Sequence, residues 1–170
     1  MLTSEVIAAG NNILHAVCQS QGPGGHEVGL LLPDNCLEAN LNLANSAGLT
    51  GLHLAIAKRE EPLFSWLLSL QPDLTLLSPA GQTYLEFSLL NFSPEICRGL
   101  LAVWPRHLQF CQEENKETWL HFAAKTGLLQ QAELLLQCDS GSDVEARDAN
   151  LQTPLHYAVL FNQVLSQFDQ

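Results

Sequence analysis

The sequence has few positively charged residues. Only 7 of its 170 residues are Lys or Arg, against 18 Asp and Glu, so its formal net charge at pH 7 is −11. Binding to nucleic acid or to an anionic membrane depends on clustered cations. The composition therefore argues against both partners. An acidic surface favours a basic protein partner by electrostatic steering, although it also serves solubility alone.

Long apolar runs are absent as well. No stretch of about 18 apolar residues, the length that spans a bilayer, occurs in the sequence. The first residues, Met1 to Glu5, carry no positive charge and begin no apolar stretch of the length of a signal peptide. We therefore expect a soluble, cytoplasmic protein.

The sequence also lacks a Cys-x-x-Cys spacing among its five cysteines. An odd number of cysteines without metal-ligand spacing is typical of reduced thiols in a cytosolic protein. Cys18, Cys97 and Cys138 lie in or at the end of expected helices, and we expect them to be packing residues. Cys111 follows His107 closely, but a catalytic Cys/His pair needs a third orienting group and a pocket. We therefore expect no catalytic residue and no enzyme activity.

A four-residue phrase recurs along the chain. Its fourth position returns at intervals of 38, 33, 35 and 35 residues, and a fixed period in this range is typical of a stacked repeat array. The five copies are Asn12-Ile13-Leu14-His15, Thr50-Gly51-Leu52-His53, Thr83-Tyr84-Leu85-Glu86, Thr118-Trp119-Leu120-His121 and Thr153-Pro154-Leu155-His156.

The last copy shows the family resemblance best. Residues 141–158 read GSDVEARDANLQTPLHYA, which resembles the ankyrin-repeat consensus almost residue for residue. The turns before the phrase contain Gly48 and Gly81, where glycine adopts a positive φ without strain. The tetratricopeptide repeat has a similar length, but its Trp and Gly-Tyr spacing is missing. The third copy is the weakest, because Glu86 replaces the histidine and Ser88 replaces the first alanine.

The resemblance implies an all-α fold, an ankyrin-repeat solenoid of helix-turn-helix units joined by finger-like turns. We expect a single domain over residues 1–170, with two antiparallel helices in each unit and one continuous core. Insertions at residues 19–25 and around Pro33 make the first unit irregular. The array is either truncated in its last unit or continues in a longer protein. The expected repeats lie near residues 5–35, 41–72, 74–105, 109–140 and 144–170.

The pattern also predicts particular helices. Ser93 is expected to cap a helix that begins at Pro94. Apolar residues at helical spacing predict the inward face of three second helices. These faces are Ile96, Leu100, Val103 and Trp104 in the third unit, Leu128, Ala132, Leu135 and Leu136 in the fourth, and Phe161, Leu165 and Phe168 in the fifth.

The histidines of the phrase are His15, His53, His121 and His156, one in each of four repeats. Zinc ligands must lie about 2 Å from one metal ion, so residues a whole repeat apart do not form a metal site. We expect no metal and no cofactor. The resemblance implies that these histidines hydrogen-bond the backbone of the finger turns and hold neighbouring units in register.

The expected function is that of a protein-protein interaction module. In the ankyrin pattern, the residue after the histidine lies on the concave side of the first helix, beside the fingers. Aromatic residues are strong anchors there, although the same residues also serve as packing under the neighbouring finger. The expected contacts with a basic or amphipathic partner segment are Leu54, Phe87, Phe122 and Tyr157, after Ala16 in the first unit, with Ser46, Ser78, Glu114 and Asp148 as a partly acidic rim.

Two other functions stay open. The chain is alternatively a targeting or regulatory ankyrin segment of a larger adaptor, enzyme or secreted bacterial effector, in which case the host-cell cytosol is a possible location. A free-standing enzyme is the other alternative, and only Cys111 points to it.

Overall fold

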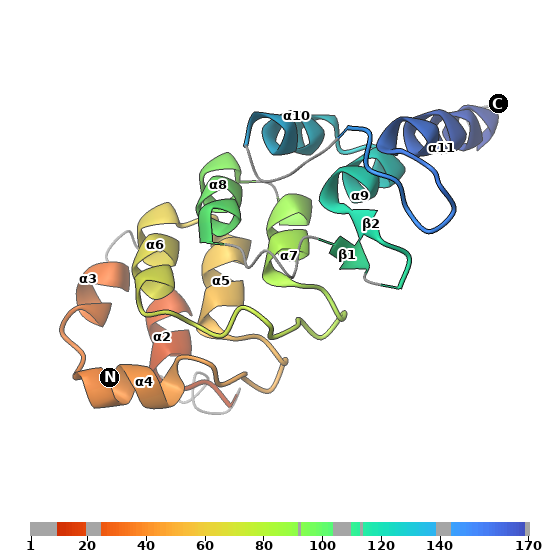
Figure 1. The fold of residues 1–170 in the computed structure, drawn as a ribbon. Coiled ribbons are helices and arrows are strands. Elements are labelled where there is room, and N and C mark those ends of the chain that lie inside the picture. The colour runs from red at the N-terminus through yellow and green to blue at the C-terminus, as the bar shows by residue number, and fades with distance from the viewer. Residues whose placement is uncertain are drawn as a thin grey trace. The chain divides into compact units, whose positions relative to one another are not determined.

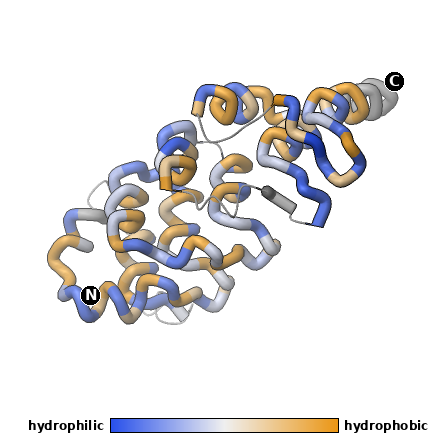
Figure 2. Tube along the Cα trace, viewed as in Figure 1, coloured by the Kyte–Doolittle hydropathy of each residue, from blue (hydrophilic) through white to orange (hydrophobic). Residues whose placement is uncertain are grey.

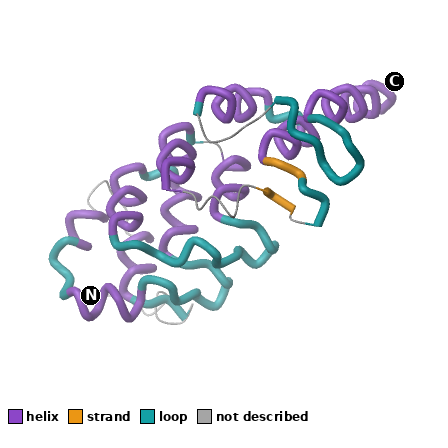
Figure 3. Tube along the Cα trace, viewed as in Figure 1, coloured by secondary structure: helices purple, strands orange, loops and turns teal. Residues whose placement is uncertain are grey.

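The computed structural model describes residues 10–19, 25–91, 93–103, 110–112, 114–138 and 144–168. The described part contains helices α2 to α11 and two short strands (Figures 1 and 3). The chain forms two compact units, residues 1–99 and residues 100–170, and the division falls within α8. The expected single domain with one continuous core over residues 1–170 stays a prediction.

The first unit is built of helix pairs joined by short turns. A two-residue connection joins α5 to α6, and such a short link requires the two helices to run antiparallel. The expected insertion around Pro33 contains an additional helix, α4, which begins at Asp34. The helices are α2 (Ile13–Gln19), α3 (Gly25–Gly29), α4 (Asp34–Asn40), α5 (Gly51–Lys58), α6 (Glu61–Ser69), α7 (Tyr84–Asn91) and α8 (Pro94–Val103).

The second unit contains the end of α8 and then a small hairpin. Strands β1 (Phe110–Gln112) and β2 (Glu117–Thr118) pair antiparallel, with an irregularity between their two pairs of facing residues. The hairpin forms the finger before helix α9 (Trp119–Thr126), which is followed by α10 (Leu129–Gln137) and α11 (Pro154–Phe168). Strand content in the described part is thus small, as an all-α fold requires.

One helix of the second unit differs from the prediction. The repeat pattern predicts two helices in the fifth repeat, but α11 is a single helix of 15 residues. Its sequence has no glycine or proline after Pro154 to end the first helix, whereas α9 ends at Gly127 with a left-handed φ of 70°. Phe161 is half-buried on α11, and the side chains of Leu165 and Phe168 lie outside the described residues.

The turns and caps follow the sequence pattern. Gly48 and Gly81 have a φ of 74°, which confirms the expected positive-φ turns. Helix α8 begins at Pro94 as predicted, and the backbone carbonyl of Ser93 accepts the first helical hydrogen bond from Cys97. The glycine turns and the start of α8 were therefore predicted correctly from the residues next to them in the sequence.

The buried face of the second helices differs in part from the expected one. Ile96, Leu100 and Leu135 are fully buried, as predicted. Val103 and Leu136 are instead about half exposed, at 50% and 51%. The buried residues of α10 are Gln131, Leu134 and Leu135, so Leu134 takes the inward position that was predicted for Leu136. Trp104 lies outside the described residues. Figure 2 shows how apolar and polar positions alternate along the helices.

The cysteines agree with the expected packing role where they are described. Cys18 and Cys97 are buried thiols, Cys36 and Cys138 are partly buried, and none of these four forms a disulfide. The side chain of Cys111 lies outside the described residues. Among the helices that the structure describes, none combines the length and the apolar character needed to cross a membrane.

Candidate functional site

Each first helix with a histidine in the phrase begins with the same side-chain pairing. The backbone N–H of Thr50, Thr118 and Thr153 donates to Nδ1 of the histidine three residues later, over 3.3, 3.2 and 3.1 Å. Asn12 replaces the threonine in the first repeat and donates to His15 Nδ1 over 3.1 Å. Because Nδ1 accepts a hydrogen bond, the proton of the neutral ring resides on Nε2. The pairing thus caps the helix and leaves a donor at the far side of the ring.

Two histidines use that donor to hold the next finger. His15 Nε2 lies 2.7 Å from the carbonyl oxygen of Leu49, and His121 Nε2 lies 3.0 Å from that of Gln152. Both carbonyls belong to the residue just before the next helix cap. The expectation that the histidines bond the finger backbone is therefore confirmed for these two repeats.

His53 is the exception. It is fully buried, and its Nε2 has no hydrogen-bond partner among the described residues. The Tyr84 ring lies against the imidazole with a centroid distance of 4.2 Å, and the Phe87 ring meets it edge-on at 5.5 Å. Burial lowers the pKa of His53 to about 4. Tyr84 stands where the last repeat has Pro154, so an aromatic contact replaces the hydrogen bond at this joint.

The predicted contact residues differ in exposure. Leu54, Phe87 and Phe122 are half-buried, as is Ala16, so part of each side chain reaches the surface. Tyr157 is only 6% exposed. The position after the histidine is therefore partly accessible in the second, third and fourth repeats and is a packing position in the fifth.

The expected rim requires a correction at two residues. Ser46 and Glu114 are exposed, as predicted, but Ser78 and Asp148 are 6% and 2% exposed. Both buried side chains stabilise their own turns, because Ser78 Oγ accepts from the Gln82 N–H over 3.2 Å and Asp148 Oδ1 accepts from the Gln152 N–H over 2.8 Å. A side chain that closes its own turn does not form an exposed rim.

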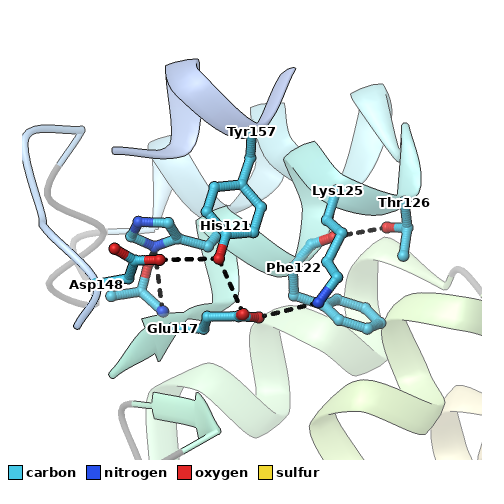
Figure 4. Close-up of polar contacts among 8 residues, drawn as sticks. Glu117, His121, Phe122, Lys125, Thr126, Asp148 and Tyr157 are labelled. Carbon is cyan, nitrogen blue, oxygen red and sulfur yellow. Dashed lines mark hydrogen bonds and ion pairs between the residues drawn. The ribbon is translucent and has the colours of Figure 1, made fainter. Parts of the chain in front are cut away.

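A buried polar cluster underlies the surface of the second unit (Figure 4). The Tyr157 hydroxyl lies 2.9 Å from Glu117 Oε1 and 2.9 Å from Asp148 Oδ2. Glu117 is only 4% exposed. A hydroxyl has one hydrogen, so it donates to one carboxylate at a time. The cluster therefore joins β2, the last finger and α11 through a single phenol.

The electrostatics of the cluster follow from this arrangement. Burial raises the pKa of Tyr157, and the hydrogen bonds and negative charges of Asp148 and Glu117 raise it further. Burial alone acts to raise the pKa of Asp148, but hydrogen bonds from Gln152, Tyr157 and Asn150 outweigh it and leave that pKa below its usual value. Tyr157 thus stays protonated and Asp148 stays ionised at neutral pH.

Lys125 completes the cluster on its exposed side. Its Nζ lies 3.5 Å from Glu117 Oε2 and 5.9 Å from the centroid of the Tyr157 ring. Lys125 and Phe122 are three residues apart on α9, so they share one face of that helix (Figure 4). Sequence reasoning missed Glu117 and Lys125 because neither repeats in the other units. Glu117 and Tyr157 are also 40 residues apart, beyond any local pattern.

Residues 85–166 match the family described as ankyrin repeats, with three copies. The all-α ankyrin-repeat fold is therefore confirmed, and ankyrin repeats are a non-catalytic fold that generally binds other proteins. The match accounts for three copies, so the five repeats expected over most of the chain are confirmed only in that part.

Two curated relatives contain similar sequence. Tyrosine-protein kinase HTK16 of Hydra vulgaris is 24% identical over 160 residues, which cover 92% of this chain and 20% of the relative. SH3 and multiple ankyrin repeat domains protein 2 of Homo sapiens is 31% identical over 127 residues, which cover 74% of this chain and 7% of the relative. The chain spans a fifth or less of the length of both.

The neutral state of His53 predicts a loss of stability in acid. The unfolded chain takes up a proton near the ordinary histidine pKa of 6.5, whereas burial lowers the pKa in the folded chain to about 4. Stability is therefore fully present above pH 6.5 and falls as the pH drops from 6.5 toward 4. Urea unfolding at pH 7, 5.5 and 4.5 should show a weaker pH dependence for His53→Gln than for the wild type.

His156→Gln is the matched control, because His156 forms the same cap but is exposed. It should retain the loss of stability in acid that the burial of His53 causes. Equal pH dependence in the two variants would contradict the role of His53.

The shared hydroxyl predicts a second stability effect. Tyr157→Phe leaves two buried carboxylate oxygens without this donor, which should lower the free energy of unfolding by about 1–3 kcal/mol. Tyr84→Phe is the control, because the Tyr84 hydroxyl pairs with the neutral Thr50 hydroxyl at 2.8 Å. Urea unfolding should show the smaller loss for Tyr84→Phe, and the reverse order would refute the stated role of the carboxylates.

Proposed function

We propose that this chain is a protein-protein interaction module that binds a helical or extended segment of a partner protein on the side formed by its first helices and fingers. The observation that carries the proposal is the shared position of Leu54, Phe87 and Phe122. Each follows the phrase's fourth residue in successive repeats, and each is partly exposed. Apolar and aromatic groups of this kind bury a large area at little cost in rotamer entropy.

The negative charge of the chain favours one kind of partner segment. The net charge of −11 favours a segment with basic residues, which Glu114 at the finger surface would meet. An amphipathic segment would place its apolar side against the half-exposed side chains. We assign Ser78, Asp148 and Tyr157 a supporting role beneath this surface, where they hold the fingers in place.

A second candidate is supported by the coverage of the relatives. Because the matched stretches are 20% and 7% of those proteins, this chain also fits a targeting or regulatory segment of a larger protein. Adaptors, enzymes and secreted bacterial effectors are the classes we consider. Binding would use the same surface in each case. We propose the cytoplasm as its location, or the host-cell cytosol for an effector.

A test begins with a displayed library of segments about 20 residues long, from which binders to the purified chain are selected. Selection of amphipathic, basic segments supports the proposal. Selection of acidic segments, or of none at any concentration tested, counts against it.

With a selected segment, Phe122→Ala should weaken binding by roughly 1–3 kcal/mol, because the variant loses a partly exposed aromatic anchor. Titration calorimetry measures the affinity, and circular dichroism checks that the helices remain. Leu136→Ala is the matched control, since Leu136 is 51% exposed on the second helix of the same repeat. If Phe122→Ala unfolds the repeat and the affinity of the folded fraction is unchanged, Phe122 is a packing residue.

Charge reversal at the finger should affect the rate of association. Glu114→Lys should slow binding of a basic segment at low salt and have little effect at high salt, because steering by exposed charges is screened. Stopped-flow measurements at two salt concentrations test this. Glu133→Lys, which reverses an exposed glutamate on α10, is the control. Equal slowing in both variants would indicate an effect of net charge alone.

A further inference from the structure

The tip of the fourth finger differs from the tips of the second and third fingers. In each finger the tip ends two residues before the cap threonine of the next helix. The second and third fingers have Ser-Ala-Gly at 46–48 and Pro-Ala-Gly at 79–81, without a charged residue. The fourth finger has Glu-Asn-Lys at 114–116, and all three residues are exposed. Lys116 therefore stands where the two earlier fingers have glycine.

The backbone of Lys116 is left-handed. Its φ is 55°, in the same region as the 74° of Gly48 and Gly81. A residue with a β-carbon has a steric cost in this region, whereas glycine does not. Glycine closes the same turn in the earlier fingers, so the turn itself does not require a lysine side chain. A residue that keeps such a conformation at a cost is a candidate for a functional role.

Packing within the chain does not account for the side chain of Lys116. The residue is exposed, and no ion pair between described residues includes it. The tip itself is held in place, because the backbone carbonyl of Asn115 accepts from the Ala149 N–H of the next finger over 2.8 Å. The held tip thus presents an ammonium group, whose three N–H donors suit a carboxylate, at a defined place on the surface.

We propose that Lys116 binds a carboxylate of the partner segment, next to the basic residue that Glu114 favours. The inference rests on the proposed binding surface and adds one acidic position to a segment that is basic overall. Complementary charge supports this occupant, because a cation of the partner at Lys116 would meet a like charge. Glu114 and Lys116 are two residues apart, so the two opposite charges of the partner lie within one helical turn or on one side of a strand.

Parallel selections from the displayed library test the proposal, with the wild type, Lys116→Gly and Arg59→Gly as targets. Arg59→Gly is the matched control, because Arg59 is also basic, exposed and left-handed, with a φ of 58°, but lies at the end of α5. Segments selected by the wild type and by Arg59→Gly should contain Asp or Glu within one helical turn of Lys or Arg. Lys116→Gly should lose this enrichment.

The selections separate this inference from the proposed function. If the wild type selects basic segments without the acidic position, or Lys116→Gly selects it equally, the role of Lys116 is overturned and the proposed surface remains. If no segment is selected by any target, both are overturned.

One selected segment then gives a quantitative test. Lys116→Gly should weaken its binding by roughly threefold at low salt, as expected for an exposed ion pair. Replacing the acidic residue of the segment with its amide should weaken binding to the wild type and have no further effect on Lys116→Gly. Lys116→Gly should also raise the urea midpoint of unfolding, because glycine relieves the left-handed turn. Additive losses of affinity, or a lower midpoint, would overturn the proposal, since the lysine would then act independently of the carboxylate or would stabilise its own finger.

Discussion

The pairing between the cap residue and the histidine three positions later is the interaction on which the repeats depend. The cap N–H donates to Nδ1, so the neutral ring has its proton on Nε2 and offers it to a carbonyl of the following finger. One side chain thereby completes the start of a helix and fixes the next turn. Protonation of the imidazole would remove the acceptor at Nδ1. The pairing therefore requires the neutral ring, and burial favours that neutral form.

The joint at His53 shows what happens when the neighbouring sequence changes. Tyr84 and Phe87 fill the space beside the imidazole, and the Nε2 donor loses its carbonyl. Aromatic packing offsets part of the free energy that an unpaired buried donor costs. The third repeat has Glu86 where the other repeats have the histidine. There the backbone N–H of Glu86 donates to Thr83 Oγ1. At the joint of His53, aromatic contacts therefore stand where His15 and His121 have a hydrogen bond to the next finger.

The polar cluster of the second unit gives the proposed binding surface a rigid base. Asp148 closes its own turn, accepts from Tyr157 and is 2% exposed. The backbone N–H of Ala149 also donates to the Asn115 carbonyl over 2.8 Å, which ties the last finger to the finger that contains Glu114. A surface held in place before binding loses less conformational entropy when a partner is bound. On the proposed surface, the buried residues would hold the fingers in place and the half-exposed residues would contact the partner.

The sequence by itself determined the period, the all-α ankyrin fold, the helix start at Pro94 and the positive-φ turns at Gly48 and Gly81. These features depend on residues close together in the chain, where cap, turn and helical spacing act directly. The family resemblance also predicted correctly that phrase histidines bond the fingers, as His15 and His121 do, because the family pattern repeats along the chain.

Only the tertiary structure decided the burial of Tyr157, Ser78 and Asp148, the cluster with Glu117 and Lys125, and the single long helix α11. A tyrosine after the histidine is equally suited to bind a partner or to pack, and its neighbours 9 and 40 residues away decide between the two. Exposure depends on what covers a side chain, and that is set by contacts between distant segments. Residue type and local spacing do not contain this information.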